Sequence, residues 1–262
     1  MISNQIKKIL RNGKSLVLAY DHGLEHGPVD FDLSSIDPSY ILDIAEKAGF
    51  NAVVLHHGIA EKYYSTLKNT VPLIVKLNGK TNISKIEPIS PQLCSVKRAI
   101  KLGAELVGYT IYVGSKNEPA IFKEFGHIVE EAHEYGVPVV AWTYPRGEFV
   151  KDELNVETLA HSARVGLELG ADFIKIKFNN NIDGFKWVVK AAGKAKVLVA
   201  GGEKSSEYDF LKEAYDVMQT GAIGLAVGRN IWQHPQPLKI SEALKKVVFE
   251  GKKPEEAMDL LK

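Results

Sequence analysis

One stretch decides the fold, Asp172-Phe173-Ile174-Lys175-Ile176-Lys177-Phe178, which is predicted to be a buried β-strand that carries two lysines. Alternate residues of a strand share a face, so Phe173, Lys175 and Lys177 lie together on one side. Ile174, Ile176 and Phe178 lie on the opposite side and are expected to pack against helices. If the strand belongs to a closed parallel barrel, the two lysines therefore point into its interior.

A lysine inside a barrel is expected to be a nucleophile. Removal from water and repulsion between like charges both favour the neutral amine. A neutral amine attacks a carbonyl carbon to form a Schiff base, which is the first step of aldol chemistry that needs no metal ion. The strand pattern alone does not choose between Lys175 and Lys177.

The length and composition allow such a barrel. The chain has 262 residues, of which 45% are hydrophobic and 25% charged, and a single α/β barrel needs about 250 residues. We therefore expect one domain over residues 1–262. A formal net charge of +1 provides no field that would attract nucleic acid or an anionic membrane, so neither is expected as a partner.

The sequence also predicts a cytoplasmic protein. The single cysteine, Cys94, has no partner for an internal disulfide, and the first residues, Met1 to Ile6, lack the apolar core of a signal peptide. No apolar run approaches the roughly 18 residues needed to cross a bilayer.

Strand-like and helix-like segments alternate along the chain. The predicted strands are Ser15 to His22, Asn51 to His57, Pro72 to Asn78, Leu106 to Tyr112, Val137 to Tyr144, Asp172 to Phe178, Lys196 to Ala200 and Ala222 to Val227. Segments with helical apolar spacing lie between them, among them Tyr40 to Ala48, Ile121 to Tyr135, Val156 to Leu169 and Phe210 to Thr220. Gly49, Gly103, Gly170 and Gly221 are predicted to end helices just before a new strand.

This alternation predicts a (β/α)8 TIM barrel. Ser3 to Arg11 is expected to form an extra helix that closes the bottom of the barrel, and Pro254 to Leu261 an appended helical tail. The second candidate is an open, doubly wound sheet.

The residues at the carboxyl ends of the strands are the candidate site, because barrel enzymes place their chemistry there. Asp21 follows the first strand and has inward parity, so its carboxylate could orient a hydroxyl group or move a proton. The structural alternative is that Asp21 caps the following turn. Inward parity shared with Lys175 favours a functional role.

Three residues at the end of the fifth strand share one parity: Trp142, Tyr144 and Arg146. An inward phenol close to a Schiff-base lysine could transfer protons, an indole could form an apolar wall and a guanidinium could bind phosphate. Each aromatic residue alone could be ordinary core. Their combination at one strand end favours a site.

Glycines follow the last two predicted strands, in Ala200-Gly201-Gly202 and in Gly228-Arg229-Asn230. Barrels often hold phosphate at these two positions with backbone N–H groups. The small inward residues Gly224, Ala226 and Gly228 leave room for a ligand. Together the two blocks predict a phosphate site.

A metal site is not expected, although His22, His26, His56 and His57 lie near the ends of the first two strands. His56 and His57 are adjacent in a strand and point to opposite faces, which leaves at most three convergent ligands. Buried, hydrogen-bonded histidines are the preferred interpretation. No cofactor is predicted.

Four blocks of this sequence resemble the archaeal-type class I fructose-1,6-bisphosphate aldolases: Leu18 to Pro28, Trp142 to Gly147, Lys175 to Lys177 and Val227 to Trp232. The resemblance runs through nearly the whole chain. It implies a (β/α)8 barrel, reversible cleavage of fructose 1,6-bisphosphate to dihydroxyacetone phosphate and glyceraldehyde 3-phosphate, and a large homo-oligomer. It also implies that Lys175 forms the Schiff base and that Tyr144 donates and accepts protons.

The same resemblance implies a set of substrate contacts: Asp21, His22, Trp142, Thr143, Tyr144, Pro145, Arg146, Lys175, Ile176, Lys177, Ala200, Gly201, Gly202, Gly228 and Arg229. Two positions depart from the family. Ala200 stands where a hydroxyl-bearing residue is common, and Phe178 stands where relatives often have Tyr. The first change removes a side-chain donor and leaves the backbone N–H groups, and the second is expected to alter packing only.

Other functions remain open at this point. The nearest is a related aldolase branch that makes 2-amino-3,7-dideoxy-D-threo-hept-6-ulosonate for aromatic amino acid biosynthesis. The continuation Leu24 to Pro28 and the second lysine, Lys177, disfavour it. A flavin or sugar-phosphate isomerase barrel would use the glycines but would not explain the inward lysines. A barrel that only binds a phosphorylated metabolite is the non-enzymatic alternative.

Overall fold

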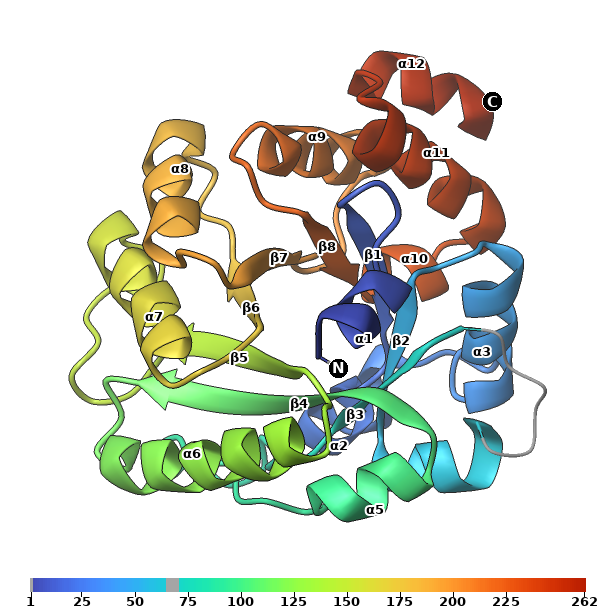
Figure 1. Ribbon diagram of the computed structural model, residues 1–262. Coiled ribbons are helices and arrows are strands. Elements are labelled where there is room, and N and C mark those ends of the chain that lie inside the picture. The colour runs from blue at the N-terminus through green and yellow to red at the C-terminus, as the bar shows by residue number, and fades with distance from the viewer. Residues whose placement is uncertain (1, 65–70) are drawn as a thin grey trace.

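Eight parallel strands close into a barrel in which each strand pairs with its neighbours in chain order, from β1 to β8 and back to β1. The computed structural model describes residues 2–64 and 71–262. Helices surround the barrel (Figure 1). The predicted TIM barrel is confirmed, and the open sheet is wrong because β1 and β8 pair through Ser15 to Leu18 and Gly224 to Val227.

The strands are β1 (Ser15–Ala19), β2 (Ala52–His56), β3 (Leu73–Lys76), β4 (Ala104–Val113), β5 (Val139–Pro145), β6 (Phe173–Lys177), β7 (Lys196–Ala200) and β8 (Gly224–Val227). The helices are α1 (Ile2–Lys8), α2 (His22–His26), η1 (Pro28–Asp30), α3 (Pro38–Lys47), α4 (His57–Ile59), η2 (Ala60–Tyr64), α5 (Val96–Lys101), α6 (Glu118–Glu134), α7 (Val156–Glu168), α8 (Ile182–Ala191), α9 (Glu207–Met218), α10 (Arg229–Trp232), α11 (Pro237–Glu250), α12 (Pro254–Met258) and η3 (Asp259–Leu261). The predicted elements agree with these to within a few residues at each end.

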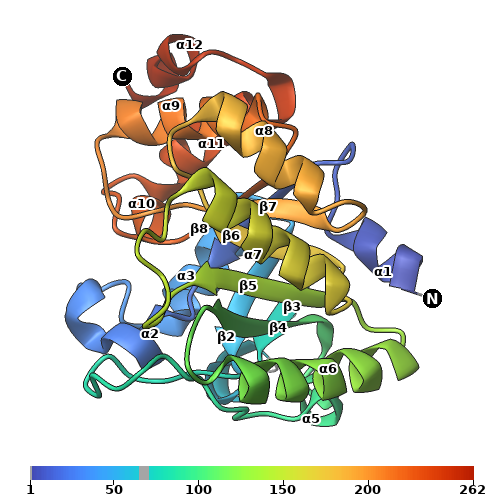
Figure 2. The same cartoon turned by 90° about the vertical axis from the view of Figure 1, so that its left-hand side faces the viewer.

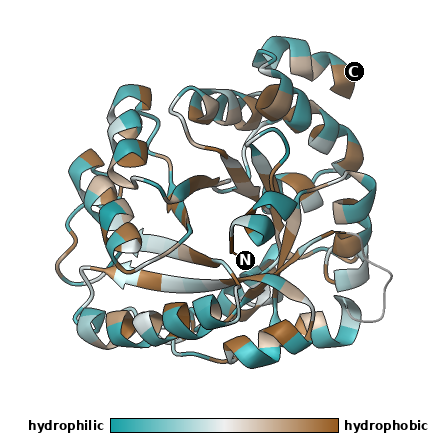
Figure 3. Cartoon of the chain, viewed as in Figure 1, coloured by the Kyte–Doolittle hydropathy of each residue, from teal (hydrophilic) through white to brown (hydrophobic). Residues whose placement is uncertain are grey.

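The apolar side chains form two layers, one inside the barrel and one between the strands and the helices. The inner layer includes Val17, Val54, Ile74, Leu106, Val140, Trp142, Phe173 and Leu198. The outer layer includes Ile174, Ile176 and Phe178, as the strand parity predicts. The helices are mixed in hydropathy, with hydrophilic and hydrophobic residues along each of them (Figure 3). This pattern is typical of helices that cover a barrel on one side and meet water on the other.

The two ends of the barrel differ. Helix α1 lies at the end where the strands begin, and α2 lies at the end where they finish (Figure 2). Ile6 and the fully buried Ile9 pack on the inner layer and close the first end. The predicted helix Ser3 to Arg11 is too long, because Asn12 and Gly13 take positive φ angles and Arg11 pairs with Lys14 in a tight hairpin. The second end is therefore the open one.

Candidate active site

A cavity of about 390 Å³ opens at the carboxyl ends of the strands. It brings together most of the predicted site residues, namely Asp21, His22, Trp142, Tyr144, Arg146, Lys175, Lys177, Ala200, Gly201, Gly202, Gly228 and Arg229. These residues come from strands β1, β5, β6, β7 and β8 or from the loops that follow them. Strand alternation and the position of the strand ends account for their convergence.

Lys175 lies on β6 deep in the cavity, with 7% of its surface exposed. Burial lowers the pKa of its amine from 10.5 to about 8. The negative charge of Asp21 opposes this shift, and the positive charge of Lys76 adds to it. At pH 7 about a tenth of such amines are neutral, against roughly one in three thousand for an ordinary lysine. The structure therefore gives Lys175 the properties of a nucleophile.

Trp142 forms one wall beside two lysines. The Nζ atoms of Lys175 and Lys76 lie 5.1 and 4.9 Å from the centroid of its ring. The ring lies over Gly108 on β4, where a Cβ atom would come within 2.0 Å of it. Glycine at position 108 is thus what makes room for the indole, and the indole face in turn stabilises cations beside it.

Lys76 is a site residue that the sequence reasoning missed. It ends β3, is 6% exposed, and its Nζ lies 3.6 Å from Oδ2 of Asp21. The signal was present, because the predicted strand Pro72 to Asn78 has a lysine within an apolar run, as β6 does with Lys175. Burial lowers the pKa of Lys76, and the charge of Asp21 opposes that shift.

Asp21 lies just beyond β1, at the start of α2, and lines the cavity. It makes no side-chain hydrogen bond that caps the helix, so the structural alternative for this residue is not supported. Burial alone would raise its pKa, but the positive charges of Lys175 and Lys76 outweigh burial and lower it. Asp21 is therefore an ionised carboxylate between two buried amines.

Tyr144 lies on the same face of β5 as Trp142 and reaches the cavity. Burial raises the pKa of its phenol, and the negative charges of Asp21 and Glu25 raise it further. The phenol consequently keeps its proton at neutral pH. A protonated hydroxyl group in the cavity is suited to donate a proton to a developing carbanion.

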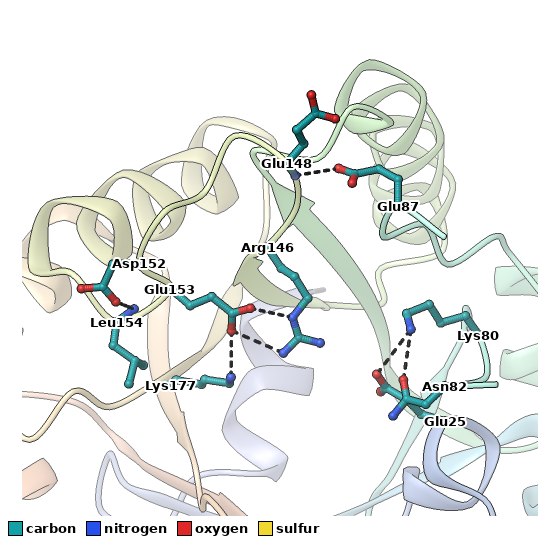
Figure 4. A network of polar contacts seen from close by, with 10 residues as sticks. All are labelled: Glu25, Lys80, Asn82, Glu87, Arg146, Glu148, Asp152, Glu153, Leu154 and Lys177. Carbon is teal, nitrogen blue, oxygen red and sulfur yellow. Dashed lines mark hydrogen bonds and ion pairs between the residues drawn. The ribbon is translucent and has the colours of Figure 1, made fainter. Parts of the chain in front are cut away.

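Two cations, Arg146 and Lys177, lie at the rim of the cavity and share the carboxylate of Glu153 (Figure 4). Nε and Nη2 of Arg146 donate to Glu153 at 3.0 and 3.5 Å, and Nζ of Lys177 donates to it at 3.1 Å. Gly147 makes the turn after Arg146 with a φ of 141°, and a Cβ there would lie 2.5 Å from Cα of Ser115. Across the cavity mouth Figure 4 shows a second group, Glu25 with Lys80, whose charged atoms are 4.0 Å apart.

The ends of β7 and β8 form a close-packed glycine pair. A Cβ at Gly201 would lie 2.8 Å from a side-chain carbon of Val227, and one at Gly228 would lie 2.7 Å from the ring of His22. Glycine at both positions therefore lets the backbone border the cavity. Nη2 of Arg229 donates to the carbonyl oxygen of Gly202 at 3.3 Å, which holds the guanidinium beside them.

Asn230 ties the two loops together. Its Nδ2 donates to the carbonyl oxygens of Gly201 and Glu203 at 3.0 and 2.9 Å, and its Oδ1 accepts from the N–H of Ser205 at 3.0 Å. The side chain is buried. Asn230 thus fixes the shape of the backbone that borders the cavity.

Three predicted contacts do not reach the cavity: Thr143, Pro145 and Ile176. Thr143 and Ile176 are fully buried on the opposite face of their strands, and Oγ1 of Thr143 donates to the carbonyl oxygen of Lys175 at 3.5 Å. Consecutive residues of a strand point to opposite faces, so Thr143 and Ile176 point away from the cavity. The family resemblance had implied contacts by runs of consecutive residues, which a strand cannot all direct to one side. Phe178, expected to be a packing residue, lines the cavity edge and also packs edge-on against Phe185.

Other cavity residues lay outside the prediction: Glu25, His26, Thr110, Leu154, Glu203 and Glu213. Thr110 lies on β4, whereas the others lie where no strand period fixes the direction of a side chain: Glu25 and His26 on α2, Leu154 and Glu203 on loops, and Glu213 on α9. Burial raises the pKa of the Glu213 carboxyl, which lies near Gly202. The acidic residues give the cavity a mixed charge rather than a purely positive one.

Two of the histidines near the ends of the first two strands, His22 and His26, have ring centroids 5.9 Å apart. Among residues 2–64 and 71–262, no group of three or more His, Cys, Asp or Glu side chains is placed to hold a metal ion. His26 pairs with Asp30 at 2.5 Å. The Nδ1 atoms of His22, His56 and His57 have no partner among the described residues, so the expectation of hydrogen-bonded histidines is wrong for these atoms. Burial lowers the pKa of His22 and of His56 to about 4.

No helix among the described residues is both long enough and apolar enough to pass through a membrane.

Comparisons with known proteins identify the family of the chain. Residues 15–234 match the DeoC/LacD family of aldolases. The chain is 49% identical to a class 1 fructose-bisphosphate aldolase of Thermoproteus tenax, over 99% of this chain and all of that protein. It is 42% identical to the same enzyme of Halobacterium salinarum, over 95% of this chain and 96% of that one.

A solved structure is similar throughout. It is an archaeal fructose-1,6-bisphosphate aldolase whose catalytic lysine is covalently bound to the carbinolamine intermediate of the substrate. The TM-score is 0.91 at 48% identity, over 95% of this chain and all of that one. A cavity built around a buried lysine with a lowered pKa is what such chemistry requires. With these matches, the chain belongs to the archaeal class I fructose-bisphosphate aldolases, the lyases that work through a Schiff base.

Proposed function

We propose that Lys175 is the residue that forms the Schiff base with fructose 1,6-bisphosphate. The neutral amine adds to the C2 ketone to give a carbinolamine, which loses water to become an iminium ion. The observation that carries this assignment is the buried amine with a pKa of about 8 at the inner end of the cavity. Lys76 is the other buried amine: burial lowers its pKa as well, and it lies in an ion pair with Asp21 at 3.6 Å. The family's motif, Lys175 to Lys177, is what favours Lys175 over it.

Tyr144 and Asp21 are proposed to move the protons. After a base removes the proton of the C4 hydroxyl group, the bond between C3 and C4 breaks, its electrons flow into the iminium, and glyceraldehyde 3-phosphate leaves. The remaining enamine takes a proton at C3 from Tyr144, whose raised pKa keeps that proton available. Asp21, ionised beside Lys175, assists the hydroxyl proton transfers. Water then releases dihydroxyacetone phosphate and restores the free lysine.

The two phosphate groups are proposed to bind at opposite sides of the cavity. One lies against the backbone at Gly201, Gly202 and Gly228, next to Arg229. The other lies at the rim with Arg146 and Lys177. Binding both ends remote from the breaking bond fixes that bond over Lys175.

The curated relatives above favour this reaction over synthesis of the hept-6-ulosonate, because they are named as fructose-bisphosphate aldolases. A cytoplasmic location and a homo-oligomeric state also remain proposals. Large apolar side chains at or near the open end, such as Val29, Leu33 and Ile83, are 82, 97 and 89% exposed in the single chain, which supports association.

The assignment is tested by reduction with borohydride in the presence of dihydroxyacetone phosphate, followed by peptide mass mapping. We expect one reduced adduct, on Lys175. An adduct on Lys76 or Lys177 would show that the nucleophile is assigned wrongly. If no adduct forms and activity instead depends on added zinc after chelation, the Schiff-base mechanism is wrong for this chain.

A further inference from the structure

Glu153 is the most unexpected neighbour of the cavity rim. It pairs with Arg146 and Lys177, which line the cavity, and so places a negative charge beside the position where a negative ligand is to bind. It lies in the loop between β5 and α7, two residues before Asn155. The Asn155 side chain accepts from the N–H groups of Glu157 and Thr158 and so begins α7. This cap anchors the loop on the side next to Glu153.

Both carboxylate oxygens of Glu153 are in use. Oε1 accepts from Nε of Arg146 at 3.0 Å, and Oε2 accepts from Nζ of Lys177 at 3.1 Å. The three side chains are 33 to 40% exposed, so water and solutes reach them. Figure 4 shows Glu153 lying between the two cations with their nitrogen atoms directed at it. A phosphate bound by the same two side chains would need the same N–H groups.

We propose that Glu153 is a specificity-determining residue. In the free enzyme it occupies the N–H groups of Arg146 and Lys177, and it competes for them with the 6-phosphate of fructose 1,6-bisphosphate, here called the distal phosphate. The proposal rests on the assignment of that phosphate to Arg146 and Lys177. A phosphate dianion displaces the carboxylate because it carries more charge and more acceptor oxygens. A weaker anion with a single charge does not, so the rim is closed to it.

The lowered pKa of Glu153 is consistent with this arrangement. Burial would raise it, but the hydrogen bonds and charges of Arg146 and Lys177 outweigh burial. The carboxylate is thus ionised at neutral pH, when the substrate is also bound as an anion. Displacing it breaks three hydrogen bonds, which weakens net phosphate binding and eases release of the aldehyde product.

The test compares Glu153→Gln and Glu153→Ala with Glu157→Gln, a matched control that removes an equal charge from an exposed position in the first turn of α7. KM is measured for fructose 1,6-bisphosphate and for fructose 1-phosphate, which lacks the distal phosphate. Competition predicts that both Glu153 variants lower KM for the bisphosphate by about threefold to tenfold. KM for fructose 1-phosphate and all constants of the control variant should stay as in the native enzyme.

The opposite result identifies a positioning role and overturns the proposal. If Glu153 holds the cations in place, Glu153→Ala raises KM for the bisphosphate, and Glu153→Gln, which keeps an acceptor oxygen, raises it less. An unchanged KM in both variants also overturns it. Inhibition by inorganic phosphate gives an independent measurement, since competition predicts a lower inhibition constant in both variants.

Arg146→Met separates this proposal from the phosphate assignment beneath it. If Arg146→Met raises KM for the bisphosphate but not for fructose 1-phosphate, the distal phosphate binds at Arg146. The Glu153 variants then test only whether Glu153 competes with that phosphate. If Arg146→Met has no such effect, the phosphate assignment has failed. Borohydride trapping of dihydroxyacetone phosphate should be equal in every variant, which verifies that each retains an intact inner site.

Discussion

The Nζ atom of Lys76 lies 3.6 Å from Oδ2 of Asp21, and the two side chains are 8 and 11% exposed. This ion pair joins the end of β3 to the residue that precedes α2. Its position beside Lys175 means that a change in either partner alters the charge felt by the proposed nucleophile.

Replacing Lys76 with Met should slow Schiff-base formation. The charge of Lys76 helps to lower the pKa of Lys175, so its removal raises that pKa and protonates more of the amine. We expect adduct formation at pH 7 to be about tenfold slower, measured by borohydride trapping over time. Lys76→Arg keeps the charge and should be closer to the native rate. Equal slowing in both variants would mean that shape at position 76, not charge, is what matters.

The pH dependence of adduct formation in the native enzyme should follow the Lys175 amine. Below its pKa of about 8 the amine is protonated and unreactive, so the rate rises with pH toward that value and levels off above it. Asp21→Asn removes a charge that raises this pKa, and the rising limb should move to lower pH. A limb that stays in place in Asp21→Asn would show that Asp21 does not act on Lys175 through charge.

Tyr144→Phe should separate adduct formation from turnover. The ring remains but the acidic proton is lost, so trapping of dihydroxyacetone phosphate is retained while cleavage slows by about a hundredfold or more. Tyr135→Phe, at an exposed position that ends α6, is the control and should behave as native. If Tyr144→Phe abolished trapping instead, Tyr144 would belong to the formation of the iminium ion.

Gly108→Ala should disturb the inner site by displacing Trp142. A Cβ atom there would lie 2.0 Å from the indole ring, and overpacking of this kind costs about 1 to 3 kcal/mol of folding free energy. Gly126→Ala on α6 meets nothing within 4 Å and should stabilise the chain by about 0.5 to 1 kcal/mol. Thermal unfolding of the two variants checks both signs, and a neutral Gly108→Ala would contradict the packing argument.

Asn230→Ala should weaken binding of the phosphate at the backbone of Gly201, Gly202 and Gly228. Its loss leaves the carbonyl oxygens of Gly201 and Glu203 and the N–H of Ser205 without that partner, so the two loops are no longer held together. We expect KM to rise by about tenfold for fructose 1,6-bisphosphate and fructose 1-phosphate alike. A rise for the bisphosphate alone would place Asn230 at the other phosphate.

Strand parity was the part of the sequence that carried most information. The alternation of strands and helices predicted the barrel, and parity placed Lys175 and Trp142 inside it, because a buried strand leaves a side chain only two directions. Applied to the third strand, parity also predicts the inward Lys76. Applied to the fifth and sixth strands, it predicts that Thr143 and Ile176 point away from the cavity. The choice of Lys175 over its neighbour came from family resemblance and not from geometry.

The rim of the cavity was harder to predict. Glu213, which lines the cavity, lies on α9, and Glu153, which pairs with the rim residues Arg146 and Lys177, lies in a loop. The directions of both side chains depend on how those elements pack rather than on a repeating spacing. The Nδ1 atoms left without partners on three histidines were equally invisible, since a histidine's hydrogen bonds depend on neighbours distant in sequence. The distances among rim residues come only from the folded chain.

Ile6 and Ile9 close the far end of the barrel, so in the part of the chain that the structure describes the cavity around Lys175 opens at the carboxyl ends of the strands. Fructose 1,6-bisphosphate and both triose products would pass through this same opening. A new substrate molecule would therefore reach Lys175 only after both products have left. Triose phosphate that accumulates is expected to inhibit the enzyme by occupying this opening, and such inhibition needs no separate regulatory site.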